Sequence, residues 1–405
     1  MSRAAAVTGM GLLTPAGTGA RALWECLCRA ESTAAHDPAL AGMPVDFSCR
    51  VPDFDPAGLR NIAWRTNRFI QLAVAAARMA VTDSGLAPGG WDAPRVGVVM
   101  GVGTAGMEHW PGEAEKLLHG RLRAVSPLAL PRSIPNMAAG EIALDLGVTG
   151  PNLSVSTACA SGATALGVAK DLLASGRCDV VLAGGAESPR ASQMAAVCFA
   201  RMSVLSRGRH GPSGASRPFD ADRDGFVLGE GAAVLVLESA EHARGRRAAV
   251  RAWLSGYGAS ADAHHPTTPD PRGGGASAAI GAALAEAGLR PCDIDHVNAH
   301  GSSTELNDLY EARALCRIFA EPPPVTANKG SLGHGIGAAG AIEAACAVLT
   351  LQHQLLPPVA NFTRLDPRID LDVVAGTPRR RTVRAVLSNS FGFGGQNAAL
   401  VLTRA

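Results

Sequence analysis

The stretch FVLGEGAAVLVL, residues 226–237, has a counterpart in FGFGGQNAALVL, residues 391–402, at a constant offset of 165 residues. Six of the twelve positions are identical, and in each copy a glycine turn leads into an apolar strand. Such internal similarity indicates two related halves. If each copy closes one half, the boundary falls in the charged stretch Glu238–Arg247 and divides the chain into residues 1–245 and 246–405. Chance similarity between two apolar strands is the alternative interpretation.

The rest of the chain has the alternating pattern of an α/β protein. Two segments repeat small and apolar residues with helical spacing and end at a glycine: Asn67–Ser84 before Gly85, and Ser277–Ala287 before Gly288. A chain of 405 residues exceeds one ordinary hydrophobic core, which also favours two core-forming halves. The predicted strands between the helical segments include Ala4–Val7, Val96–Met100, Leu153–Val155 and Val180–Leu182.

The composition excludes several classes of protein. Hydrophobic residues make up 47% and charged residues 18% of the chain, which is neither disordered nor fibrous. The formal net charge of +2 gives no support to bulk binding of nucleic acid or of an anionic membrane. No run approaches the roughly 18–20 apolar residues of a membrane span. The apolar start, Met1–Pro15, is interrupted and fits a first strand better than a signal peptide.

Nine scattered cysteines argue against a disulfide framework and for a reducing, cytoplasmic location. Cys26 and Cys28 lack a second pair at zinc-finger spacing, so we expect no metal site there. His264 and His265 lack a partner one helical turn away, and the same expectation holds for them.

The segment Ser156–Gly162 places Cys159 between the strand Leu153–Val155 and a helical run, Ala163–Ala169. Unpaired N–H groups and the macrodipole at a helix N-terminus stabilise an anion. The position therefore predicts a lowered thiol pKa and a nucleophilic thiolate. A buried cysteine without a chemical role is the alternative, and the flanking small and hydroxyl residues favour the nucleophile.

A histidine follows in similar surroundings. His300 lies in NAHGSST, residues 298–304, after the apolar run Ile294–Val297, which places it for acid–base chemistry rather than packing. Asp308 and Glu311 come next, with i, i+3 spacing on a predicted helix. Their carboxylates can hold a lysine or a water, or they can face solvent.

A second histidine, His334, lies in NKGSLGHGIGAAG, residues 328–340, which opens the helical run Ala341–Leu351. A nucleotide-binding P-loop is the alternative. Lys329, however, precedes the glycines, and the order G-x-x-x-x-G-K-[ST] is absent. The glycines instead allow a small acyl group to approach the backbone closely.

Three irregular segments are predicted to be loops. NSFGFGGQN, residues 389–397, follows the strand Val383–Leu387. Its glycines predict a mobile loop that presents backbone N–H groups to a pocket, with a plain turn as the alternative. Ser206–Arg223 and Ser260–Gly275 are predicted surface loops that cover a site or touch a partner.

Together these segments resemble the β-ketoacyl-acyl-carrier-protein synthases, specifically the synthase II type and the related ketosynthase subunits of polyketide assembly. The order Cys, His, Lys, His is highly specific. The resemblance implies the thiolase fold, an α/β architecture of two similar halves in five alternating layers, αβαβα. The likeness runs end to end and includes VTGMG at 7–11, PNMAAG at 135–140, SRPFD at 216–220 and RDGFVLGEG at 223–231.

The resemblance also implies a two-step reaction in fatty acid or polyketide synthesis. Cys159 accepts an acyl chain from the pantetheine arm of an acyl carrier protein, while its own N–H and that of Phe393 hold the oxyanion. His300 and His334 then promote decarboxylation of malonyl carrier protein and stabilise the enolate, which attacks the acyl cysteine. No cofactor besides the pantetheine arm is implied.

Other residues match family positions of known role. Lys329 matches a lysine held by carboxylates that correspond to Asp308 and Glu311. Ser302 and Thr304 match hydroxyls that contact the pantetheine arm; the family usually has Thr at the position of Ser302, and either hydroxyl can serve. Phe393 matches a gate at the acyl pocket. Further candidates for binding the acyl chain are Phe391, Val102, Met107 and Met137.

Two kinds of partner are implied. Family members are dimers in which Pro131–Met137 helps to close the neighbour's acyl pocket, so a homodimer is expected. A heterodimer with a catalytically silent chain-length factor is the alternative. A thiolase, a non-condensing acyltransferase and a non-catalytic scaffold are alternative functions, although a thiolase is expected to carry a second cysteine where this chain has Phe391–Gln396. Candidates for docking the acidic carrier protein are Arg65, Arg68, Arg207 and Arg209.

Overall fold

The structure, a computed structural model, describes residues 4–59 and 61–405. Over those residues the main sheet follows the order β11-β10-β14-β15-β9-β1-β8-β7-β5-β6, with β2 paired to β1. β1 and β9 join two groups of strands through a short antiparallel register, Ala5–Val7 with Ala252–Leu254. We call the group from β1 to β6 the first sheet and the group from β9 to β11 the second sheet.

The strands of the first sheet are β1 (Ala5–Thr14), β8 (Gly231–Glu238), β7 (Val180–Glu187), β5 (Val96–Gly101) and β6 (Asn152–Val155). Those of the second sheet are β9 (Ala252–Ala261), β15 (Gln396–Arg404), β14 (Ala385–Gly392), β10 (His296–Asn298) and β11 (Val325–Thr326). The remaining strands are β2 (Gly17–Thr18), β3 (Ala34–His36), β4 (Phe47–Cys49), β12 (Leu355–Leu356) and β13 (Arg379–Arg380).

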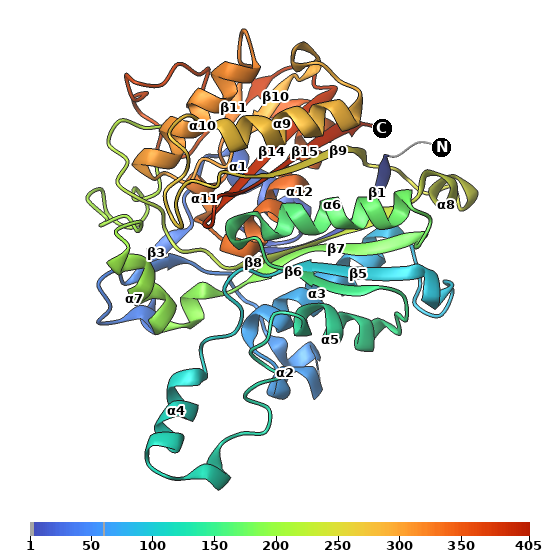
Figure 1. Cartoon of the computed structure of the whole chain (residues 1–405), viewed down its shortest axis with the longest axis vertical. Helices are drawn as coiled ribbons and strands as arrows, with labels where there is room; N and C mark the ends of the chain where they lie inside the picture. The colour runs from blue at the N-terminus through green and yellow to red at the C-terminus, as the bar shows by residue number, and fades with distance from the viewer. Residues whose placement is uncertain (1–3, 60) are drawn as a thin grey trace.

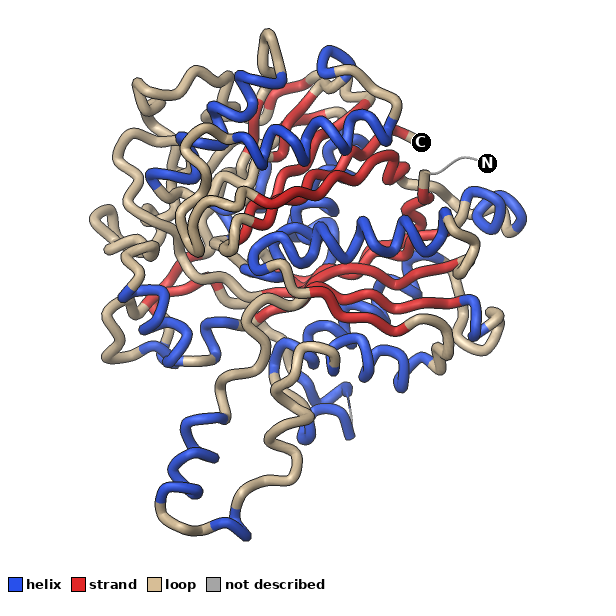
Figure 2. Tube along the Cα trace, viewed as in Figure 1, coloured by secondary structure: helices blue, strands red, loops and turns tan. Residues whose placement is uncertain are grey.

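Helices cover both outer faces and fill the space between the two sheets (Figures 1 and 2). The first sheet carries α3 (Arg68–Ser84) and α5 (Met137–Leu146) outside, the middle layer is α6 (Ser161–Ala174) and α12 (Ala339–His353), and the second sheet carries α9 (Gly274–Ala287) and α10 (Glu305–Ile318) outside. The other α-helices are α1 (Gly19–Cys28), α2 (Asn61–Arg65), α4 (Trp110–Leu118), α7 (Gln193–Arg201), α8 (Ala240–Gly245) and α11 (Lys329–Leu332). The predicted αβαβα order is confirmed.

The internal repeat has a structural counterpart. β8 and β15 contain the repeated apolar stretches, and each is the second strand of its sheet, counted from the seam between β1 and β9. The chain passes from the first sheet to the second through α8, which follows β8 directly. Division of the chain at residue 245 stays a prediction.

Glycines explain why the first strand is longer than predicted. The prediction ended it at Val7, whereas β1 continues through Gly9 and Gly11 to Thr14. A Cβ at Gly11 would lie 1.8 Å from the carbonyl oxygen of Ala76 in α3, so the glycines let a helix pack closely against the strand instead of ending it. The two predicted helices are confirmed as α3 and α9, each of which ends at a left-handed glycine.

Two loop predictions need correction. β14 continues to Gly392, so the loop predicted over residues 389–397 shrinks to a short turn before β15. Within Ser206–Arg223, the stretch Ala215–Asp220 is buried rather than on the surface. Within residues 4–59 and 61–405, one helical stretch, Ile336–His353, has the length and hydropathy of a membrane span, and 89% of it is buried inside the protein, as in a core helix.

Candidate active site

A cavity of about 590 Å³ brings most of the predicted site residues together. Cys159 comes from the short turn just before α6, whereas His300 and His334 follow β10 and α11 of the second half. The predicted residues that line the cavity are Cys159, His300, Ser302, Thr304, Glu311, His334, Phe391, Phe393, Arg207 and Arg209. Within the described residues, no group of three or more His, Cys, Asp or Glu side chains is placed to share a metal ion.

Cys159 sits in a tight turn that joins β6 to α6. Ala158 has a φ of +49°, a conformation that L-residues seldom adopt, and it directs the chain sharply into the helix. The Ser161 hydroxyl donates to the carbonyl oxygen of Ala158 at 2.6 Å and accepts from the N–H of Thr157 at 2.9 Å. The predicted position of Cys159 at a strand-to-helix turn is therefore correct.

The predicted thiol pKa is wrong for the free protein. Burial raises the pKa of Cys159 to about 12, against the opposing effects of the Lys329 charge and the N–H of Phe393. The thiol is only 7% exposed and packs in an apolar cluster with Phe199 and Ile336. The loss of hydration therefore raises the thiol pKa by more than the helix terminus lowers it, and Cys159 is a neutral thiol in the free protein.

We expect alkylation of Cys159 by iodoacetamide to accelerate by about tenfold per pH unit from pH 7 to 10, because the thiolate fraction grows in that proportion below the thiol pKa. Peptide mass spectrometry of timed samples measures this rate at the Cys159 peptide. A plateau that begins below pH 9 would show that the helix terminus, rather than burial, controls the thiol.

The two histidines face each other across the cavity. Their ring centroids are 5.4 Å apart and the ring planes meet at 81°. Burial lowers the pKa of His300 and of His334 well below the ordinary value, and the Lys329 charge lowers both further. Both imidazoles are thus neutral at pH 7, and each can accept or donate a proton.

Lys329 lies behind His300, and its carboxylate partner differs from the prediction. The ammonium group forms an ion pair with Glu343 of α12 and donates to the carbonyl oxygen of His300 at 2.6 Å. It also lies 3.3 Å from His300 Nδ1. Glu343 has a detectable signal in the sequence, since it is the one charged residue between Ala338 and Thr350.

Asp308 and Glu311 do not hold Lys329, contrary to the resemblance. Glu311 accepts the backbone N–H groups of His300 at 2.9 Å and Gly301 at 2.8 Å, and the Asn389 side chain at 3.1 Å. Burial raises the pKa of Glu311 to about 7 in spite of these donors. The carboxylate satisfies N–H groups left unpaired after β10 and thereby fixes the loop that carries His300.

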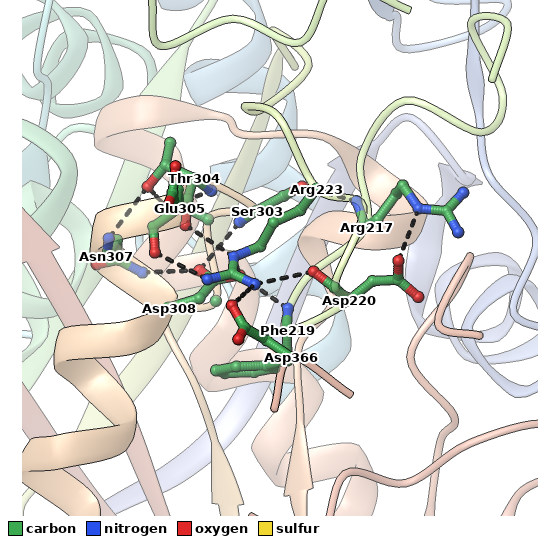
Figure 3. A network of polar contacts seen from close by, with 12 residues as sticks. Arg217, Phe219, Asp220, Arg223, Ser303, Thr304, Glu305, Asn307, Asp308 and Asp366 are labelled. Atoms are coloured by element: carbon green, nitrogen blue, oxygen red, sulfur yellow. Dashed lines mark hydrogen bonds and ion pairs between the residues drawn. The ribbon is translucent and has the colours of Figure 1, made fainter. Parts of the chain in front are cut away.

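Asp308 belongs to a separate polar network at the cavity wall (Figure 3). It accepts the N–H groups of Phe219 at 2.8 Å and Ser303 at 3.1 Å. Arg223, whose side chain is 1% exposed, lies 3.6 Å from Asp308 and donates to Asp366 at 2.8 Å. The network ties the buried stretch Ala215–Asp220 to the start of α10.

Backbone and hydroxyl donors complete the cavity. Phe393 packs with Cys159 at the cavity, and its backbone N–H lowers the pKa of the thiol. A Cβ at Gly392 would lie 3.1 Å from the Cys159 nitrogen, and only glycine allows this close approach of the two segments. Ser302 Oγ and Thr304 Oγ1 lie 2.9 Å apart on the cavity wall.

Not all predicted residues lie at the cavity. Val102 and Met137 pack in the hydrophobic cluster outside the first sheet, and neither they nor Met107 line the described walls. Arg65 is paired with Glu141 at 2.5 Å and Arg68 with Glu230 at 2.8 Å. Arg207 and Arg209 are exposed at the cavity mouth, where Arg209 lies 3.7 Å from Asp224. The roles of these residues stay predictions.

Comparison with known proteins agrees with this geometry. The family models "Beta-ketoacyl synthase, N-terminal domain" and "Beta-ketoacyl synthase, C-terminal domain" match residues 2–243 and 251–363. The chain is 38% identical to 3-oxoacyl-[acyl-carrier-protein] synthase 2 of Coxiella burnetii over 99% of both chains. It is 41% identical to a provisionally named polyketide beta-ketoacyl synthase 1 of Streptomyces halstedii, over 100% of this chain and 98% of the relative.

The solved structure of the ishigamide ketosynthase/chain length factor superposes with a TM-score of 0.93 at 34% identity, covering 100% of both chains. The chain belongs to the beta-ketoacyl synthase family. It is a condensing enzyme that transfers acyl groups, and its fold is the thiolase fold.

Proposed function

We propose that the chain transfers an acyl group from an acyl carrier protein to Cys159 and condenses it with malonyl carrier protein, with loss of CO₂. One observation carries this proposal: a buried thiol and two neutral imidazoles, those of His300 and His334, share a single cavity. The arrangement supplies a nucleophile, a proton acceptor and two hydrogen-bond donors without a further group.

In the first step, the Cys159 sulfur attacks the thioester carbon. The thiol proton passes to an imidazole of the cavity, the new S–C bond forms, and the pantetheine sulfur leaves and takes up a proton. The N–H groups of Cys159 and Phe393 stabilise the oxyanion of the tetrahedral intermediate. The lowering of the Cys159 pKa by the Phe393 N–H supports this role.

In the second step, loss of CO₂ from the malonyl thioester leaves an enolate whose oxygen needs hydrogen-bond donors. The Lys329 ammonium next to His300 Nδ1 can only donate, so the neutral ring carries its proton on Nε2. That N–H, with the one from His334, stabilises the enolate oxygen. The enolate carbon then attacks the acyl carbon on Cys159. The new C–C bond replaces the C–S bond, and the cysteine leaves as a thiolate that takes up a proton from water.

The proposal is tested with purified protein and acyl carrier protein that bears a short acyl chain. Intact-protein mass spectrometry is expected to show one added acyl group, located on the Cys159 peptide. Malonyl carrier protein is then expected to yield CO₂ and a β-ketoacyl product longer by two carbons. A thioester without condensation would identify a non-condensing acyltransferase, and no thioester at all would indicate a scaffold. A series of acyl primers in the same assay defines the chain length.

The partners follow from the exposed surface. Arg207 and Arg209 at the cavity mouth support docking of an acidic carrier protein, in line with the carrier protein named for the Coxiella relative. We place the reaction in the cytoplasm, in fatty acid or polyketide synthesis.

A second subunit is supported by apolar side chains on one side of the first sheet. β6 is an edge strand on which Leu153 is 40% exposed, and Leu144 of α5 is 71% exposed. α4 and its flanking loops project from the body, with Leu118 at 84% exposure (Figure 1). Such surfaces are typical of subunit interfaces. The partner is a second copy or a chain-length factor of the kind named for the ishigamide structure.

A further inference from the structure

A buried carboxylate that the proposed reaction does not use lies behind Cys159. Glu187 is the last residue of β7 and is 0% exposed. Among the residues that the structure describes, no arginine, lysine or histidine forms an ion pair with it; its partners are hydrogen-bond donors. Burial of a carboxylate without a paired cation costs free energy, so the presence of Glu187 at this position needs an explanation.

Glu187 contacts two segments that are distant in sequence. Glu187 Oε2 accepts the N–H of Gly103 at 2.6 Å and the N–H of Thr104 at 2.9 Å, and Oε1 accepts the Thr104 hydroxyl at 2.9 Å. Gly337, just before α12, packs against the same carboxylate, since a Cβ there would lie 2.7 Å from Glu187 Oε2. One side chain therefore joins the end of β7, the turn after β5 and the turn that follows His334.

These turns contain strained backbone. Ile336 has a φ of +44°, which is a genuine outlier for a β-branched residue, and Ala158 before the nucleophile has a φ of +49°. A Cβ at Gly103 would lie 2.9 Å from Glu187 Oε2 and from Ile336 Cγ2, and 3.2 Å from the Ala158 carbonyl oxygen. The strained residues thus pack around the same point as the carboxylate. Strain of this kind persists only where the surroundings fix it.

We propose that Glu187 is a positioning residue, whose hydrogen bonds to Gly103 and Thr104 and close packing against Gly337 hold the turns on either side of Cys159 and His334 in the reactive arrangement. It acts as a hydrogen-bond acceptor of the right length rather than as a charge. Burial raises the pKa of Glu187 to about 7, so the surroundings do not favour the charged form. Glu187 does not line the cavity, and it acts through other residues.

Two variants separate length from charge. Glu187→Gln keeps the length and an acceptor oxygen for the two N–H groups, and its amide can donate to the Thr104 hydroxyl. Glu187→Asp keeps the carboxylate but shortens the side chain by one methylene, which moves the oxygens away from their donors. We expect Glu187→Gln to form the Cys159 thioester within about threefold of the wild-type rate, and Glu187→Asp to be slower by about tenfold or more. The acyl-carrier concentration at half-maximal rate should not change.

The reverse order, with Glu187→Asp faster than Glu187→Gln, would overturn the inference in favour of a charge effect. The matched control is Glu238, a buried carboxylate at the other end of the β7–β8 pair, opposite Val180. If Glu238→Asp, at an equal loss of melting temperature, slows acylation as much as Glu187→Asp, general destabilisation explains the result and the inference fails.

Glu187→Gln also decides the matter if Glu187→Asp does not fold, since a Gln variant below a tenth of the wild-type rate would contradict the proposed role. The inference rests on the proposed function only for its readout. Absence of a thioester in the wild-type protein would overturn the proposed function, whereas the order of the two Glu187 variants concerns Glu187 alone.

Discussion

Cys159→Ala is expected to abolish acyl transfer while the protein keeps its fold. Cys159 is the one cysteine on the described walls of the cavity, so no other thiol is available to form the thioester. Removal of the sulfur leaves a methyl group in the apolar cluster around it, which costs about 1 kcal/mol of stability. Intact-protein mass spectrometry after incubation with acyl carrier protein measures the loss, and thermal unfolding measures stability.

Cys346→Ala is the matched control. Cys346 is buried in α12 and does not line the cavity, so its variant should lose similar stability and keep the wild-type thioester yield. A thioester that persists in Cys159→Ala would move the nucleophile to another residue, and the proposed chemistry would have to be rebuilt around that group.

His334→Ala is expected to slow decarboxylation by roughly 10²–10⁴-fold, the usual contribution of a positioned acid–base group. Acyl loading should fall much less, because that step forms no enolate and its oxyanion is stabilised by backbone N–H groups rather than by His334. Release of CO₂ from malonyl carrier protein and formation of the Cys159 thioester are measured separately in the same preparation.

His353→Ala is the control for the loss of a histidine. Its ring stacks on Trp24, with centroids 4.8 Å apart, and it does not line the cavity. Both steps should therefore proceed at wild-type rates. Equal losses in loading and decarboxylation for His334→Ala would contradict the division of roles between the two histidines.

Local sequence patterns were enough to indicate two related halves and to single out candidate site residues, whereas the five-layer order was implied by the family resemblance. The repeat at residues 226–237 and 391–402 is a property of neighbouring residues, and so are the glycine-stopped helices. Cys159, His300 and His334 each stand beside glycine or other small residues where a strand or helix ends, and such positions are visible without knowledge of the fold.

The contacts between distant segments were not predictable in this way. Lys329 pairs with Glu343 rather than with Asp308 or Glu311 because α12 passes behind the His300 loop, and only the packed layers determine that approach. The pKa of Cys159 depends on how much water the cluster around it excludes. A helix terminus can be recognised from sequence, whereas the burial that outweighs it cannot.

The thiol and the two imidazoles are contributed by opposite sides of the seam between β1 and β9. No single strand or helix carries all three side chains, so their spacing depends on how α6 and α12 pack between the two sheets. A substitution in the inner layer of α6 and α12, even far from any substrate, would therefore change the turnover rate. The rate of the reaction therefore depends on how the two halves of the chain are aligned, and neither half determines it alone.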